Sequence, residues 1–328
     1  MRIKELDAFR GLAALSVLVY HFTARYTQIF GDKMYFSFSY GWLGVPVFFI
    51  LSGFVIHLTL DNCKSAKDFL FKRFFRLYPT YWIAICCTLL VVYLSQIEVL
   101  KIPLVHILVN FTMWHDFFGF KHIDGVYWSL LPELLFYLFM AFLFIIKGLD
   151  RYYMYNSILL IFCVIHYLFS LPIIGKILDL HYVLLFMVGI AFYRIYTRKN
   201  TFLEHIFIIS NVFIGTFLYQ VEQSSTSVKF LLFALIGIVI LYYLFVYGFL
   251  SFLSKIKFLL FLGNISYALY LVHQNIGYVT IYYLRDSVGL FMAILIASLQ
   301  AVLLAYFITY FIEPKFRKRL KKILFNEK

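Results

Sequence analysis

Long apolar segments recur over the whole chain, and this recurrence limits the possible folds more than any other feature. Hydrophobic residues make up 63% of the sequence and charged residues only 14%, which is unlike a soluble globular domain. Inside a bilayer every backbone N–H and C=O group needs a partner within the protein, so such segments cross as helices. We therefore expect an all-α polytopic membrane protein.

Ten segments are apolar over the roughly 20 residues that a helix needs to cross the hydrocarbon core. They are the ranges 11–30, 41–60, 79–97, 128–147, 152–170, 178–196, 202–220, 229–250, 258–284 and 288–312. A shorter apolar piece, 102–114, lies within 98–127 and is expected to be re-entrant or interfacial. The first segment is not expected to be a cleavable signal peptide, because no small-residue cleavage site follows its apolar stretch.

The basic residues are distributed unevenly between the two sets of connecting loops. Of 29 Lys and Arg residues, 21 fall on the side of both termini and 7 on the other, with Arg10 at the membrane boundary. Because cytoplasmic loops carry the excess of positive charge, both termini are expected to be cytoplasmic. The net charge of +13 is then mostly a topology signal and indicates no nucleic-acid partner. Residues 1–314 are expected to form one transmembrane domain, followed by a short basic cytoplasmic tail, 315–328, that can contact anionic lipids.

The first apolar segment carries two ionisable side chains on one helical face, Arg10 and His21. They are ~16 Å apart along a helix axis, which is roughly half the thickness of the hydrocarbon core. Ionisable groups at such depth face a bundle interior or a polar cavity, so they are functional candidates. The pattern favours a site that is entered from the surface near Arg10, although a histidine used only for packing is the alternative.

Glu133 is the second ionisable candidate and lies about one turn inside the fourth segment. Ser129 is expected to cap this helix and Pro132 to fit its first turn. The fourth segment begins on the side where the first one ends, so Glu133 and His21 are expected at similar depth. A carboxylate beside an imidazole fixes the tautomer and raises the basicity, as a general base requires. The alternative is a structural polar contact between helices.

A pair of arginines precedes the third segment, within the sequence Arg73 to Pro79. Arg73 and Arg76 point the same way if this turn is helical, and Pro79 is expected to start the membrane helix. Paired guanidinium groups suit phosphate recognition at the cytoplasmic face. Ordinary anchoring by positive charge is the alternative interpretation.

The ninth segment concentrates hydrogen-bonding groups on one sector of a helix. Three of them share a face, at i, i+4 and i+7: Ser266, Tyr270 and His273. So many polar groups are expected to face a cavity or partner helices, where His273 either holds an acceptor hydroxyl or packs. By contrast, the glycines of 41–54 are expected to permit close helix packing. The spacing of the four cysteines predicts neither a metal site nor a disulfide framework.

Taken in order, these elements resemble the bacterial acyltransferase-3 family of integral-membrane O-acyltransferases. The motifs are Leu-Asp-x-x-Arg-Gly with His21, Gly-Val-x-x-Phe-Phe-x-Leu-Ser-Gly-Phe, Arg-x-x-Arg-x-x-Pro, Trp-Ser-Leu-x-x-Glu, Ile-Ser-Tyr-x-x-Tyr-Leu-x-His and Ile312-Glu313-Pro314. Each motif is short, but the ordered set covers essentially the whole chain. Some family members carry an added periplasmic esterase-like domain, and this chain is expected to be the stand-alone membrane form.

The resemblance implies transfer of an acyl group, usually acetyl, from cytoplasmic acyl-CoA to a hydroxyl of a cell-surface carbohydrate such as O-antigen or exopolysaccharide. The expected location is the bacterial inner membrane, with acyl-CoA as donor substrate and no tightly bound cofactor or metal. The expected donor-binding residues are Arg10, Arg73 and Arg76. The expected catalytic residues are His21 and Glu133. The expected acceptor-binding residues are Trp128, Ser266, Tyr270 and His273.

Two other classes of membrane protein fit intramembrane charges, a glycolipid transporter or flippase and a proton-relay sensor. Against the transporter, no inverted repeat or pair of broken helices is evident in the sequence. Against the sensor, a proton relay does not explain the arginine pair. The interpretation that we favour has His21, oriented by Glu133, act as general base on the acceptor hydroxyl, with a covalent acyl-enzyme as the open alternative.

Overall fold

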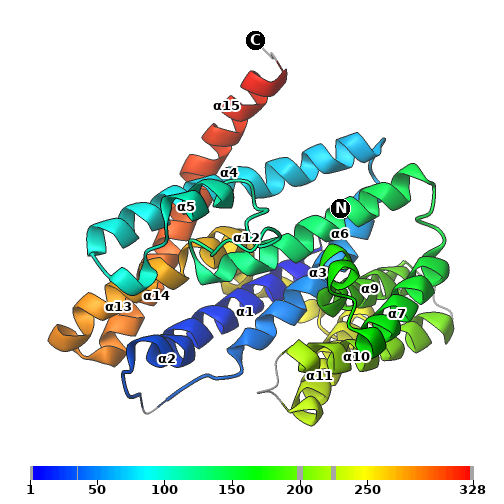
Figure 1. Cartoon of the computed structure of the whole chain (residues 1–328), viewed down its shortest axis with the longest axis horizontal. Helices are drawn as coiled ribbons and strands as arrows, with labels where there is room; N and C mark the ends of the chain where they lie inside the picture. The colour runs from blue at the N-terminus through cyan, green and yellow to red at the C-terminus, as the bar shows by residue number, and fades with distance from the viewer. Residues whose placement is uncertain (1–2, 35, 198–201, 223–226, 326–328) are drawn as a thin grey trace. The chain divides into compact units, whose positions relative to one another are not determined.

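A computed structural model describes residues 3–34, 36–197, 202–222 and 227–325 (Figure 1). Over these ranges the chain forms helices and no strand, which confirms the all-helical prediction. It divides into two compact units. Unit 1 contains Met1–Gly44, Phe74–Leu131 and Ile256–Lys328, and unit 2 contains Val45–Arg73 and Pro132–Lys255.

Among the described residues, seven helices are long and apolar enough to cross a membrane. They are Gly41–Leu60, Ala66–Ser95, Gly125–Ile145, Tyr152–Phe169, Gly175–Tyr196, Val228–Val246 and Leu290–Ile323. Two further apolar helices, Phe202–Leu218 and Lys257–Val272, are shorter. The chain is therefore a multi-helix membrane protein, while the expected count of ten spans stays a prediction.

The first expected span is helical but not uniform. It consists of α1 (Lys4–Tyr20), a π turn η1 (His21–Arg25) and α2 (Tyr26–Phe30). This segment is not among the seven apolar helices in the described part of the chain, because polar and charged side chains interrupt it. The change of helical pitch begins at His21, and single π turns of this kind are frequent at functional sites.

The prediction of one helix over 258–284 is wrong. The structure has α12 (Lys257–Val272) and α13 (Gln274–Val288), which meet at His273. The cause is the backbone N–H of Asn275, which donates to Asp124 Oδ2 at 2.9 Å instead of to a carbonyl one turn earlier. A side chain that takes an N–H out of the helical ladder interrupts the helix at that point.

The prediction that Pro79 starts a helix is also wrong. Helix α4 runs from Ala66 to Ser95 with Pro79 inside it. At ~1.5 Å per residue its 30 residues span ~45 Å, which exceeds a ~30 Å hydrocarbon core. The arginine pair therefore lies on a continuous helix. It falls in the N-terminal part of α4, which exceeds the length of one membrane crossing.

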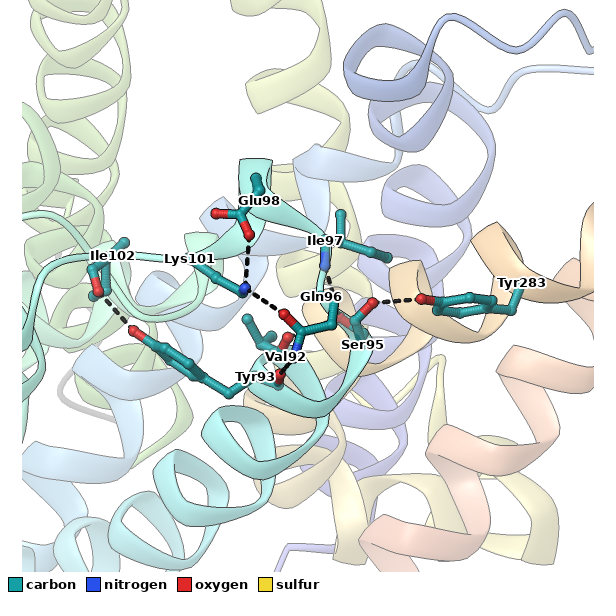
Figure 2. A network of polar contacts seen from close by, with 9 residues as sticks. All are labelled: Val92, Tyr93, Ser95, Gln96, Ile97, Glu98, Lys101, Ile102 and Tyr283. Carbon is teal, nitrogen blue, oxygen red and sulfur yellow. Dashed lines mark hydrogen bonds and ion pairs between the residues drawn. The ribbon is translucent and has the colours of Figure 1, made fainter.

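The segment after α4 lacks a long helix, as expected for 98–127. Its elements are η3 (Glu98–Leu100), α5 (Leu104–Asn110) and η4 (Gly125–Ser129). Figure 2 shows how the turn that leaves α4 is held. Lys101 Nζ donates to Glu98 at 2.7 Å and to Gln96 at 3.0 Å, while the Tyr283 hydroxyl donates to the Ser95 carbonyl. The Lys101 bonds hold the turn itself, and the Tyr283 bond attaches the end of α4 to α13 within unit 1.

Helices α1 and α12 lie side by side in unit 1. They run parallel, because Gly11 lies against Gly263 and, ten residues later, His21 lies against His273. A Cβ atom on Gly11 would lie 2.5 Å from the Leu259 carbonyl oxygen, and one on Gly263 would lie 2.0 Å from that of Asp7. Both distances are far below a van der Waals contact, so only glycine fits at these two positions. The two backbones therefore touch directly, without side chains between them.

The glycines of the 41–54 segment also serve close packing, as expected. Cβ atoms on Gly41 and Gly44 would meet carbonyl oxygens of α1 at 2.3 and 2.6 Å. In unit 2, a Cβ on Gly53 would lie 2.0 Å from the Phe186 carbonyl oxygen, so α3 (Gly44–Leu60) touches α9 (Leu180–Tyr196). The start of the 41–54 segment thus packs against α1 in unit 1. Its end pairs α3 with α9 in unit 2.

Unit 2 contains most of the remaining helices. They are α6 (Leu130–Ile145, shared with unit 1), α7 (Tyr152–Phe169), α8 (Pro172–Leu178), α10 (Phe202–Glu222), α11 (Val228–Val246) and η5 (Ser251–Lys255). This unit contains a buried ion pair, since Arg194 Nε lies 2.8 Å from Glu204 Oε1 and the Glu204 side chain has no exposed surface. The Tyr153 hydroxyl donates to the same carboxylate at 2.6 Å, which helps to satisfy the buried charge.

The contact between α1 and α12 is expected to fail when Gly263 gains a methyl group. Gly263→Ala forces backbone displacement of both helices, and we expect a cost of roughly 1–3 kcal/mol in stability with a lower thermal midpoint in detergent. Gly237→Ala is the control, because no atom lies within 4 Å of its Cβ position. Equal midpoints for the two variants would contradict the direct backbone contact.

Candidate active site

His21 and His273 occupy equivalent positions on the two parallel segments. Each lies ten residues after the glycine at which the helices touch, Gly11 or Gly263. Because the segments run parallel from that contact, the two imidazoles are brought to the same level. His273 Nε2 lies 2.9 Å from His21 Nδ1, with ring centroids 4.9 Å apart. The structure thus forms a histidine pair within unit 1.

The hydrogen-bond partners determine which nitrogen of each ring carries the proton. His273 Nδ1 lies 2.9 Å from the Tyr270 carbonyl and 3.1 Å from the Leu269 carbonyl. Carbonyls only accept, so this nitrogen is the donor and His273 Nε2 is left as an acceptor. His21 Nδ1 therefore carries its proton, which it shares between His273 Nε2 and the Val17 carbonyl at 3.0 Å. We assign both rings as Nδ1–H tautomers on this basis.

This assignment leaves His21 Nε2 as an unprotonated nitrogen. No described residue forms a hydrogen bond with it, and the His21 side chain is half-buried rather than enclosed. The opposite nitrogen is held by two acceptors, so the ring is oriented. An oriented neutral imidazole with one open lone pair can accept a proton from a substrate hydroxyl.

Aromatic packing fixes the His273 side of the pair. The Phe22 ring lies 6.1 Å from the His273 ring between centroids and 6.4 Å from that of Tyr278. A Cβ on Gly277 would lie 2.2 Å from Phe22 Cζ, so α13 begins close against the π turn. His273 is 1% exposed and has protein partners for both ring nitrogens. His273 is therefore well placed to orient the ring of His21.

The other predicted polar groups of the ninth segment are also buried in unit 1. Ser266 donates to the Gly263 carbonyl at 2.8 Å, on its own helix. The Tyr270 hydroxyl lies 2.7 Å from Ser129 Oγ and 3.1 Å from the Val126 carbonyl. Ser129 thus joins η4 to α12, whereas a capping role for α6 was expected. Trp128, on the same short helix, is half-buried.

Asp124 holds η4 to the start of α13, a role that the sequence analysis missed. Its carboxylate accepts from the backbone N–H groups of Asn275 at 2.9 Å and Val126 at 3.2 Å. Burial raises the pKa of Asp124 to about 7, although these two N–H groups act in the opposite direction. The Asn275 side chain donates to the Ile123 carbonyl at 2.8 Å and completes the attachment. Asp124 thus reaches the helix break at which His273 lies.

Glu133 belongs to unit 2 and has its own partners there. The Ser52 hydroxyl donates to Glu133 Oε1 at 3.3 Å, and the Tyr137 hydroxyl donates to the same oxygen. The predicted need of this carboxylate for partners is thereby met inside unit 2. The expected pairing of Glu133 with His21 joins residues of the two units and stays a prediction.

The three predicted donor-binding arginines have different surroundings. Arg73 is half-buried, donates to Thr59 Oγ1 at 2.7 Å and lies 5.6 Å from the Tyr137 ring centroid. Arg76 is exposed and lies 5.8 Å from the Tyr267 ring centroid on α12. Arg10 donates to Asp7 Oδ1 at 3.2 Å. Of the three, Arg76 presents the most accessible guanidinium.

A second histidine pair, also missed, lies in the 98–127 segment. His115 Nε2 is 2.8 Å from His122 Nδ1, and His122 Nε2 is 3.6 Å from Asp116. Burial lowers the pKa of His115 to about 3, so this ring is neutral at pH 7. No group of three or more His, Cys, Asp or Glu side chains among the described residues is placed to hold a metal ion.

Comparison with known proteins identifies the family of the chain. The family described as "Acyltransferase domain" matches residues 3–310, so the chain belongs to the acyltransferase-3 family. A relative from Acidianus two-tailed virus, named "Putative acetyltransferase ORF330", is 29% identical over 160 residues. The match covers 46% of this chain and 43% of the viral protein, which is less than half of that relative. No solved structure matches the chain.

The raised pKa of Asp124 is expected to make stability depend on pH. The folded protein keeps this proton up to a pH of about 7, whereas the unfolded chain loses it near the ordinary value of 3.8. The contribution of this bound proton to the free energy of unfolding is therefore full at low pH and is lost as the pH rises through about 7. Asp124→Asn removes it, so the fall in thermal midpoint between pH 5 and 8 is expected to be smaller than in the wild type. The same fall in both proteins would contradict the assignment.

Proposed function

We propose that this protein is a membrane O-acyltransferase that moves an acyl group, most simply acetyl, from acyl-CoA to a hydroxyl of a cell-surface carbohydrate. The single observation that carries the proposal is the open Nε2 lone pair of His21, on a ring held by His273 and the Val17 carbonyl. Membership of the acyltransferase-3 family supports the reaction class. The name of the viral relative supports acetyl as the group transferred.

In the proposed reaction, His21 Nε2 takes the proton of the acceptor hydroxyl as its oxygen attacks the thioester carbonyl carbon. The tetrahedral intermediate then releases the CoA sulfur as the C–S bond breaks, and the proton on His21 Nε2 passes to that sulfur. The acyl ester is the product, and the imidazole returns to its starting tautomer. The bond from His21 Nδ1–H to His273 Nε2 shares the positive charge that forms on His21 during the step.

The roles of the remaining predicted residues follow from their surroundings. Arg76, exposed on α4, is proposed to hold phosphate groups of the donor, with Arg10 as a further cation on α1. Arg73 is proposed to act at the same helix turn while it also packs on Tyr137. Glu133 is proposed to assist His21, and Trp128 to face the acceptor. Ser266 and Tyr270 are proposed to shape the acceptor side through their buried hydrogen bonds.

The parallel packing of α1 and α12 supports the ten-span topology. If both helices cross the membrane in the same direction, the chain between them crosses an odd number of times. Six apolar helices and the shorter Phe202–Leu218 lie in that part of the described chain, which makes seven crossings. With α1, α12 and the last helix the total becomes ten, so both termini lie on one side. The excess of basic residues on that side supports a cytoplasmic location, and we propose the bacterial inner membrane.

Replacement of His21 tests the general base. His21→Gln is expected to lower acetyl transfer from labelled acetyl-CoA to a surface glycan by about 10²–10⁴-fold, the range for a lost general base. Donor binding is expected to persist, which serves as the internal control for folding. His273→Phe is expected to lower kcat less, because His21 Nδ1–H keeps the Val17 carbonyl. Full activity of His21→Gln would refute the mechanism.

Replacement of Arg76 tests the donor site. Arg76→Ala is expected to raise the apparent KM for acetyl-CoA about tenfold, because a charge-assisted phosphate contact is lost. Lys67→Ala removes a cation elsewhere on the same helix and is expected to leave this KM unchanged. Titration with acetyl-CoA at saturating acceptor measures the apparent KM of both variants. A change in acceptor kinetics alone would contradict the phosphate-binding role of Arg76.

A further inference from the structure

The last helix of the chain extends well beyond the length of a membrane crossing. Helix α14 (Leu290–Phe307), the π turn η6 (Ile308–Ile312) and α15 (Glu313–Phe325) follow one another without a break. The apolar helix Leu290–Ile323 has 34 residues and spans ~51 Å, against a hydrocarbon core of ~30 Å. Its basic end therefore projects from the bilayer, as the first turns of α4 do.

The basic end of the last helix packs against α4 within unit 1. The Phe316 ring lies 6.4 Å from the Trp82 ring, and Lys321 Nζ lies 5.3 Å from the centre of the Phe75 ring. Because the higher-numbered residue of α15 meets the lower-numbered residue of α4, the helices run antiparallel. We call this element, residues 74–82 with Glu313–Phe325, the cationic prong.

Helix α15 packs against α4 through its apolar face, and its basic side chains are exposed. Phe316, Arg317 and Leu320 are half-buried, at i, i+1 and i+4. The exposed basic residues are Lys315, Lys318, Arg319, Lys321 and Lys322. An amphipathic helix that lies in a lipid surface needs its apolar face for the lipid. Here Phe316 contacts Trp82, so a soluble polyanion suits α15 better than a lipid surface.

The exposed basic residues of the prong form no ion pair with an acidic side chain in the described part of the chain. The one acidic residue of α15, Glu313, is paired with Arg317. Arg76 follows Phe75 directly on α4, is exposed, and forms no ion pair with an acidic side chain in the described part of the chain. Lys321 therefore meets α4 at the residue next to Arg76, so each of the two helices brings one cation to this part of unit 1. Two cations that face aromatic rings and form no ion pair among the described residues are suited to phosphate groups.

We propose that the side of the cationic prong that carries Lys321 binds the phosphate groups of the donor nucleotide, with Lys321 as a second cation in addition to Arg76. This inference rests on the proposed function, because it takes acyl-CoA as the donor. The nucleotide part of CoA carries a diphosphate and a separate 3′-phosphate monoester. One arginine cannot neutralise both groups, whereas cations from two helices can hold them together. The prong thus makes the C-terminal helix a part of the donor site.

The test compares binding of acetyl-CoA and 3′-dephospho-acetyl-CoA to the full-length protein in neutral detergent. Lys321→Ala is expected to weaken acetyl-CoA binding about tenfold and to narrow the preference for it over the 3′-dephospho analogue. Lys321→Arg is expected to retain the preference. Arg319→Ala is the matched control, because it removes one charge from the opposite face of the same helix. Its affinity is expected to stay within about twofold of the wild type.

Each contrary outcome identifies what fails. If the wild type binds acetyl-CoA and Lys321→Ala binds it equally well, the prong is not a donor site, while the proposed function stands. If the wild type binds neither compound, the proposed function and this inference both fail. A third arm measures activity in nanodiscs with and without anionic lipid. If Lys321→Ala changes only the dependence on anionic lipid, lipid headgroups are the ligand of the prong and the inference is overturned.

Discussion

The direct backbone contact between α1 and α12 is the constraint on which the proposed site depends. Two glycines, Gly11 and Gly263, remove the side chains that would otherwise separate the helices. Because the helices run parallel from this contact, residues at equal distances from it come together, and ten residues further on these are His21 and His273. Short polar links then hold the surrounding chain, with Asp124 at the helix break and Ser129 against Tyr270.

In the proposed mechanism, His273 orients the general base and His21 is the general base. His273 is buried and has its Nδ1–H bound to backbone carbonyls, so its remaining lone pair faces His21. A neutral partner orients the imidazole without placing a second full charge in the membrane interior, where an ion is expensive. The arginines lie elsewhere, on the extended length of α4 and near the start of α1. In the proposed function, the donor phosphates and the acyl group therefore contact different parts of the chain.

Much of this was accessible from the sequence. Apolar length predicted the helices, and the rarity of ionisable residues in such segments directed attention to His21, Glu133 and His273. The partner of His21 was not identified, because helical periodicity places residues on a face but says nothing about which helices touch. The equal spacing of Gly11 to His21 and Gly263 to His273 was the available signal. The helix break at His273 depends on a distant carboxylate, Asp124, and no local pattern reports it.

The most direct test of the central claim is the protonation state of His21 in the resting protein. With ¹⁵N-labelled histidine, the nitrogen chemical shifts distinguish the two neutral tautomers, and a His21→Gln sample identifies the signal among the nine histidines. The account predicts a neutral His21 ring that is protonated at Nδ1 and unprotonated at Nε2, at the pH of activity. A ring protonated at Nε2 has no lone pair there for the acceptor hydroxyl and would contradict the proposed mechanism.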